Sequence, residues 1–97
     1  MGGECDTHSG LLSIDINGVS KACGGTVSIA GACGYLRCDL YEDAGSCCIN
    51  WSASIAPDGG DECVVTFTNA DGSTEERRVP VTREPDSECV EWQSVEF

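Results

Sequence analysis

The residues with the clearest chemical potential in this sequence are its eight cysteines, about 8% of the 97 residues. An even number of cysteines at this density is typical of a disulfide scaffold in an oxidising compartment. We therefore predict four intramolecular disulfides that use every cysteine: Cys5, Cys23, Cys33, Cys38, Cys47, Cys48, Cys63 and Cys89. Eight cysteines allow about 105 connectivities, and the sequence does not choose among them.

A zinc site is the alternative use of these cysteines. Structural zinc sites usually show two short Cys or His pairs, whereas this chain has no C-x-x-C spacing and a single histidine, His8. Disulfides are therefore the better interpretation, and we expect neither a metal site nor a cofactor.

Two of the cysteines are adjacent, in the stretch SCCINWSASIA at residues 46–56. Neighbouring residues of a strand point to opposite faces, so Cys47 and Cys48 should bond to different partners. The alternation predicts Cys47 in the core with Trp51, and Cys48 on the outer face. A bond between Cys47 and Cys48 themselves is the strained alternative.

Catalytic signatures are weak, and we expect a protein that is not an enzyme. A nucleophilic site needs a base, but the single imidazole, His8, lies in a Gly-rich terminal segment. Two acidic loops have the oxygen ligands that calcium prefers: one contains Asp58, Asp61 and Glu62, and the other contains Asn69, Asp71, Glu75 and Glu76. Asp, Asn and Gly are also ordinary turn residues, so we expect solvated turns and at most millimolar calcium binding.

The formal net charge of −12 argues against some classes of binding partner, nucleic acid above all. Phosphate contacts need clustered Lys and Arg, so we expect no binding to nucleic acid. The sequence lacks an apolar run of membrane-spanning length, so we expect no membrane insertion, and high net charge favours a monomer. We expect a secreted, periplasmic or cell-surface location, with an export signal that once preceded this chain.

Alternation of apolar and polar residues predicts seven short strands separated by turn residues. This spacing is typical of an all-β sandwich. We expect no helix, an arm over residues 1–10 and a single domain over 11–97. The interval from Cys38 to Trp51 resembles the Cys-to-Trp spacing of immunoglobulin domains, which suggests an immunoglobulin-like architecture. Inward positions predict one core: Leu12, Ile14, Ile16, Val27, Ile29, Leu36, Leu40, Ile49, Trp51, Ile55, Val65, Phe67, Val79, Val81 and Val90.

One predicted strand face has the composition of a binding surface. Tyr35, Arg37, Asp39 and Tyr41 alternate with apolar residues, and Tyr and Arg are enriched in protein interfaces. The sequence therefore predicts a binding module for a protein or glycan at the cell exterior. The alternative is a small inhibitor or toxin-like effector that inserts the loop at residues 56–62 into its target.

Overall fold

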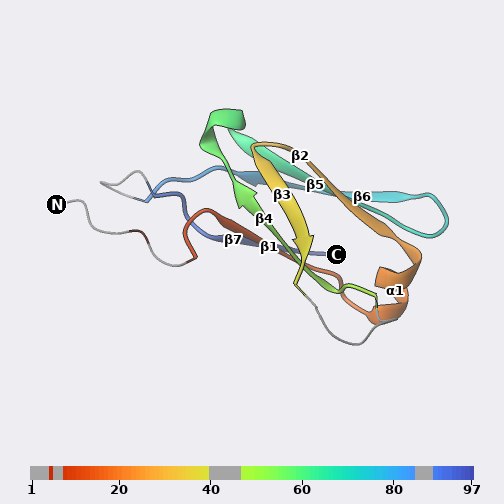
Figure 1. Ribbon diagram of the computed structural model, residues 1–97. Helices are drawn as coiled ribbons and strands as arrows, with labels where there is room; N and C mark the ends of the chain where they lie inside the picture. Colours follow the sequence, from red (N-terminus) through yellow and green to blue (C-terminus); the bar gives the residue numbers. More distant parts are fainter. Residues whose placement is uncertain (1–4, 6–7, 40–46, 85–88) are drawn as a thin grey trace.

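The computed structural model describes residues 5, 8–39, 47–84 and 89–97, which form two β-sheets and one short α-helix (Figure 1). The strands are β1 (Leu11–Asp15), β2 (Thr26–Gly31), β3 (Cys33–Cys38), β4 (Asn50–Ile55), β5 (Glu62–Thr68), β6 (Thr74–Pro80) and β7 (Gln93–Glu96). Helix α1 (Val19–Gly24) follows β1, and a 3-10 turn, η1 (Pro57–Gly59), precedes β5. The prediction of a small, mostly β fold is confirmed.

The strands are arranged as a four-stranded sheet in the order β3-β4-β1-β7 and a three-stranded sheet in the order β2-β5-β6. Neighbouring strands are antiparallel except β1 and β7, which run parallel. The chain passes between the sheets through α1, and again at Ala32 between β2 and β3 (Figure 1). Pro80 ends β6, an edge strand, where its missing N–H leaves no ladder hydrogen bond unmade.

Strand β1 is the centre of the larger sheet. Its alternating sequence buries Leu12 and Ile14 completely, and both residues belong to the core shared with Val65 and Phe67 of β5. The pattern of β5 is equally regular, with every second side chain buried from Cys63 to Phe67. The inner faces of the two sheets therefore enclose the core, as the period-2 pattern predicts.

Most of the predicted core is confirmed. The buried members are Leu12, Ile14, Ile16, Ile55, Val65, Phe67, Val79 and Val90, and the partly buried members packed against them are Val27, Ile29, Leu36, Ile49, Trp51 and Val81. Leu40 lies outside the described residues. The sequence interpretation missed the C-terminal Phe97, which is 5% exposed and packs its ring against Phe67 at 5.8 Å between centroids.

Helix α1 corrects the expectation of a chain without helix. It begins after Gly18, whose φ of 119° suits glycine, and its single buried side chain is Ala22. A helix of six residues with one buried side chain is too short to produce the apolar periodicity by which helices are found in sequences. No helix within the described part of the chain is long and apolar enough to cross a membrane.

Six of the eight cysteines form disulfides: Cys5 with Cys89, Cys23 with Cys47, and Cys38 with Cys48. The adjacent cysteines do bond to different partners, as predicted. Cys33 and Cys63 are unbonded, so the expectation of four disulfides is not met in this structure. Cys48 bonds to the neighbouring strand β3, but β4 begins only at Asn50, so the strand alternation from which an outer-face position was predicted does not extend to Cys48.

Phe67, rather than Trp51, should be the aromatic residue on which stability most depends. Phe67 is 1% exposed, whereas Trp51 is only partly buried. We expect Phe67→Ala to lower the free energy of unfolding by about 3–5 kcal/mol, because a buried aromatic leaves a cavity that its neighbours refill only in part. Urea unfolding with the disulfides intact measures this loss, with Trp51→Ala as the matched comparison. A larger loss for Trp51→Ala would contradict this assignment.

Candidate functional site

The candidate site is built on β3, an edge strand of the four-stranded sheet. The pairing of β3 with β4 shifts between two points: Gly34 lies opposite Ser54, but Arg37 lies opposite Ser52. Strand β3 therefore holds one extra residue, which is the definition of a β-bulge. Bulges re-aim side chains, and this one separates Tyr35, which is 88% exposed, from Leu36, which packs on the core.

Tyr35 has an unusual backbone conformation. Its φ is 56°, and it is the one non-glycine residue in the described ranges with a positive φ. For a residue with a side chain the left-handed region costs roughly 1–2 kcal/mol, and such residues cluster at binding and active sites. The strain therefore makes this exposed ring a candidate for function.

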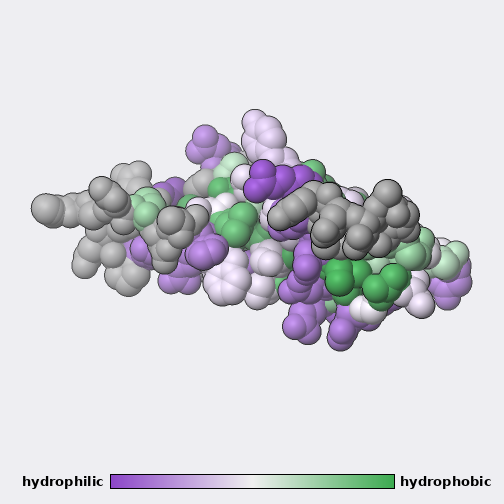
Figure 2. All heavy atoms as spheres, turned by 60° about the horizontal axis from the view of Figure 1, so that its bottom comes forward, coloured by the Kyte–Doolittle hydropathy of each residue, from purple (hydrophilic) through white to green (hydrophobic). Residues whose placement is uncertain are grey.

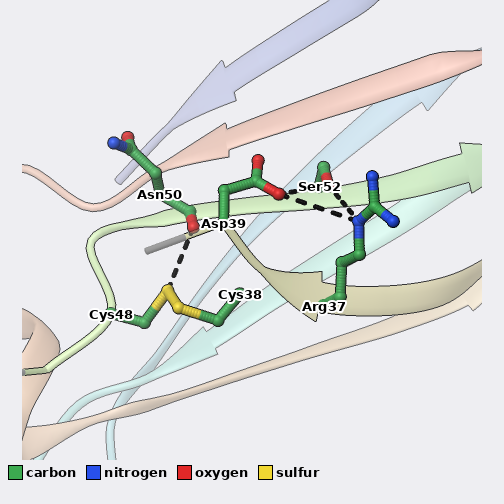
Figure 3. The surroundings of a disulfide bond; sticks show 6 residues. All are labelled: Arg37, Cys38, Asp39, Cys48, Asn50 and Ser52. Carbon is green, nitrogen blue, oxygen red and sulfur yellow. Dashed lines mark hydrogen bonds and ion pairs between the residues drawn. A yellow bond between two sulfur atoms is a disulfide. The ribbon is translucent and has the colours of Figure 1, made fainter. Parts of the chain in front are cut away.

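A polar network joins Arg37 of β3, Asp39 just after β3 and Ser52 of β4 (Figure 3). Arg37 Nε donates a hydrogen bond to Ser52 Oγ at 3.2 Å, and Ser52 Oγ donates to Asp39 Oδ1 at 3.0 Å. Arg37 Nε also lies 3.7 Å from Asp39 Oδ1. Ser52 is 3% exposed, so one buried hydroxyl is hydrogen-bonded to two outer charged groups. We call Tyr35, Arg37, Asp39 and Ser52 the β3 surface.

The end of β3 is fixed to the start of β4 beside this network. The Cys38–Cys48 disulfide joins the last residue of β3 to the segment before β4, and Cys48 Sγ lies 3.0 Å from the carbonyl oxygen of Asn50 (Figure 3). The same carbonyl accepts a hydrogen bond from the backbone N–H of Asp39 at 2.9 Å. The backbone that carries Arg37 and Asp39 is therefore held both covalently and by hydrogen bonds.

Of the four residues predicted for partner binding, Tyr35 and Arg37 lie on β3 and Asp39 directly follows it, and the structure pairs Arg37 with Asp39. Tyr41 lies outside the described residues. Sequence reasoning missed Ser52, because its contact with Arg37 depends on the register of two strands that no local pattern specifies. In this network the Ser52 hydroxyl lies between a guanidinium and a carboxylate and is hydrogen-bonded to both. His8 lies elsewhere, with its ring 6.1 Å from that of Trp92.

The carboxylates of the first acidic loop do not converge. Asp58 lies in η1 and is exposed, as is Asp61, whereas Glu62 accepts a hydrogen bond from Arg78 Nη1 at 2.6 Å. Within the described residues no three His, Cys, Asp or Glu side chains are grouped as a metal site. Arg78 therefore competes with any cation for Glu62.

The second acidic loop is a hydrogen-bonded turn between β5 and β6. Asp71 accepts hydrogen bonds from the N–H and hydroxyl of Ser73, which lower the pKa of the Asp71 carboxyl. Gly72 has a positive φ, 91°, which suits the glycine of a tight turn between two strands. Glu75 Oε2 lies 2.9 Å from Lys21 Nζ, and this contact lowers the pKa of the Glu75 carboxyl. Local hydrogen bonds and ion pairs thus occupy these oxygens.

A hollow of about 430 Å³ opens near α1 at one end of the core; it is lined by Ala22, Gly25, Thr26, Val27, Cys48, Trp51 and Phe67. It explains why Trp51 is only partly buried, and it places Cys48 on the same side of the sheet as Trp51. Figure 2, seen from below the view of Figure 1, shows apolar side chains in small patches among hydrophilic ones. A partner on the face seen there would meet a mixed surface rather than a broad apolar one.

Comparison of the chain with protein-family models, with curated proteins and with solved structures finds no match in any of the three. Inferences about function therefore rest on the residues and geometry described above.

Tyr35→Gly should stabilise the protein. Glycine adopts positive φ without the Cβ clash, and this gain exceeds its greater entropy in the unfolded chain. We expect the free energy of unfolding to rise by about 0.5–1 kcal/mol, measured by urea unfolding. Ser28→Gly is the matched control, because Ser28 is an exposed residue of β2 without positive φ. The control should lose about 0.5–1 kcal/mol. Equal losses in both variants would show that Tyr35 is unstrained.

Calcium should stabilise the protein very little. With Glu62 bound to Arg78, a calcium ion at this loop has only Asp58 and Asp61 as free carboxylates of the predicted set. Binding in the millimolar range, at about 1 mM calcium, should raise the melting temperature by at most about 3 °C over a melt in chelator. Asp61→Ala should behave like the unmodified protein. A rise of many degrees that Asp61→Ala abolishes would instead reveal a tight site.

Proposed function

We propose that this chain is a secreted or cell-surface, non-enzymatic β-sandwich module that binds a protein or glycan partner through the β3 surface. The observation that carries the proposal is Tyr35, an aromatic ring 88% exposed on a strained backbone. Strained conformations persist only where the surrounding structure enforces them, and here the bulge presents an aromatic side chain to solvent.

The neighbouring polar groups support the same proposal. Arg37 offers a guanidinium donor and Asp39 a carboxylate acceptor two and four residues after Tyr35, and Tyr and Arg are enriched at interface hot spots. The buried Ser52 hydroxyl holds both charged groups before any partner arrives, which lowers the ordering cost of binding. These three groups also match a sugar: the aromatic ring can pack on an apolar face of the sugar, and the guanidinium and carboxylate can hydrogen-bond its hydroxyls.

The compartment is part of the proposal. Three disulfides are compatible with an oxidising environment, such as the cell exterior or the periplasm. An immunoglobulin-like arrangement is the proposed description of the two sheets. One feature departs from that family: the disulfide next to Trp51 joins β3 to the segment before β4 and does not bridge the sheets.

The inhibitor alternative has less support. An inserted loop must project, but Gly59, the last residue of the 3-10 turn Pro57–Gly59, lies against the backbone of Gly31 and Ala32. A Cβ built on Gly59 would lie 3.2 Å from Ala32 Cα, so this turn is in close contact with the crossover between the sheets. Asp58 and Asp61 are exposed and serve as the test of this alternative.

Photocrosslinking tests the proposal directly. A benzophenone amino acid placed at Tyr35 keeps an aromatic side chain there, and the same group at Ser28 on β2 of the other sheet is the matched control. Both proteins are exposed to intact cells and culture medium of the natural source, and to a glycan array. We expect crosslinks or array binding from the Tyr35 position, and about tenfold or weaker binding after Arg37→Glu.

Two results would contradict the proposal. Equal crosslinking from Ser28 and Tyr35 would show nonspecific contact. Binding that survives Arg37→Glu but is lost in Asp58→Ala/Asp61→Ala would assign the partner to the loop and favour the inhibitor alternative.

A further inference from the structure

The two unbonded cysteines lie on strands of different sheets. Cys33 is the first residue of β3, opposite Ile55 of β4 in the four-stranded sheet, and it is partly buried. Cys63 is in β5, the central strand of the other sheet, and it is 1% exposed. Both residues belong to or pack against the core between the sheets.

The crossover from β2 to β3 brings these two cysteines together. Gly31, the last residue of β2, lies opposite Cys63, and the next residue, Ala32, donates its N–H to the carbonyl of Glu62 at 2.9 Å. The approach requires glycine: Gly31 has a φ of 84°, and a Cβ there would lie 2.5 Å from the Glu62 carbonyl oxygen. Cys33 is the residue after Ala32, so the backbone places it close to Cys63.

The two thiols interact. Burial and a hydrogen bond with the Cys33 side chain raise the pKa of the Cys63 thiol to about 12. The Cys33 thiol also donates to the carbonyl of Ala30 at 3.3 Å. No third metal-ligating side chain joins them among the described residues, so the pair falls short of the four ligands typical of structural zinc.

The three existing disulfides leave the two sheets without a direct covalent link. Cys5–Cys89 ties the N-terminal segment to the segment before β7, and Cys23–Cys47 ties α1 to the segment before β4. Cys38–Cys48 stays at the junction of β3 and β4. A disulfide between β3 and β5 would supply a direct covalent link between the two sheets.

We propose that Cys33 and Cys63 are a fourth disulfide-forming pair, which locks β3 of one sheet to β5 of the other. The oxidant is a disulfide donor, either a small disulfide such as oxidised glutathione or an oxidised dithiol protein. The Cys33 thiolate attacks the donor, forms a mixed disulfide and releases one donor thiol. The Cys63 thiolate then attacks the Cys33 sulfur and releases the second thiol, so two cysteine thiols are oxidised and one donor disulfide is reduced.

The order of attack follows from burial. Cys33 is the more accessible sulfur, whereas the Cys63 thiol is buried and its high pKa keeps it protonated at neutral pH. The second step should therefore be the slow one and should accelerate as pH rises toward 9. The closed bond would fix the start of β3 two residues before Tyr35.

The experiment is a thiol count on the full chain, exported to an oxidising compartment or refolded with excess oxidised glutathione. The protein is alkylated under denaturing conditions without reduction, weighed intact, and then digested for peptide mapping. We expect no alkylated cysteine and a linked peptide pair that contains Cys33 and Cys63. Two alkylated thiols at these positions, or a link from either one to another cysteine, would overturn the proposal.

Two variants supply a second measurement. Cys33→Ser should leave one alkylatable thiol, at Cys63, and should lower the melting temperature of the oxidised protein by about 10–20 °C. The double variant Cys33→Ser/Cys63→Ala should have nearly the same melting temperature as Cys33→Ser, because both variants lack the same single disulfide. Additive losses from the two substitutions would show independent packing roles and no bond. The thiol count of the unmodified chain decides the matter even if a variant fails to fold.

Discussion

The structure depends on the burial of β1 between two partner strands. β1 pairs with β4 on one side and β7 on the other, and Leu12 and Ile14 are completely buried. This arrangement joins the N-terminal strand to the C-terminal one, and the Phe97 N–H donates to the Asp15 carbonyl at 2.9 Å. The larger sheet is assembled around β1. The inner face of this sheet, and the core that the sheet shares with β5, therefore depend on this strand.

Most basic side chains of the molecule lie in local ion pairs, while the excess of acidic residues leaves the net charge strongly negative. Lys21, Arg37, Arg77 and Arg78 all lie in ion pairs with acidic residues. Lys21 and Arg77 also lie over the rings of Phe67 and Phe97, at 5.5 and 4.7 Å from their centroids. Exposed ion pairs contribute little to stability, so these residues matter more as covers for the aromatic end of the core.

The features of β3 are connected through the cysteines at its two ends. Cys38 anchors the last residue of the strand, and the proposed bond at Cys33 would anchor the first. A short strand held at both ends can keep a residue such as Tyr35 in a left-handed conformation that a free edge strand would relax. The strained Tyr35, the network of Arg37, Asp39 and Ser52, and the Cys38–Cys48 disulfide thus all lie on or directly beside this strand.

Local patterns in the sequence were sufficient to predict seven strands, most of the core and turns at the acidic loops, because strand periodicity and turn chemistry act over a few residues. The sequence also predicted different partners for Cys47 and Cys48. It could not choose those partners, place Ser52 beside Arg37, reveal the bulge at Tyr35 or show that Trp51 borders a hollow. Each of these depends on which distant segments pair, and in which register, so only the tertiary structure decided them.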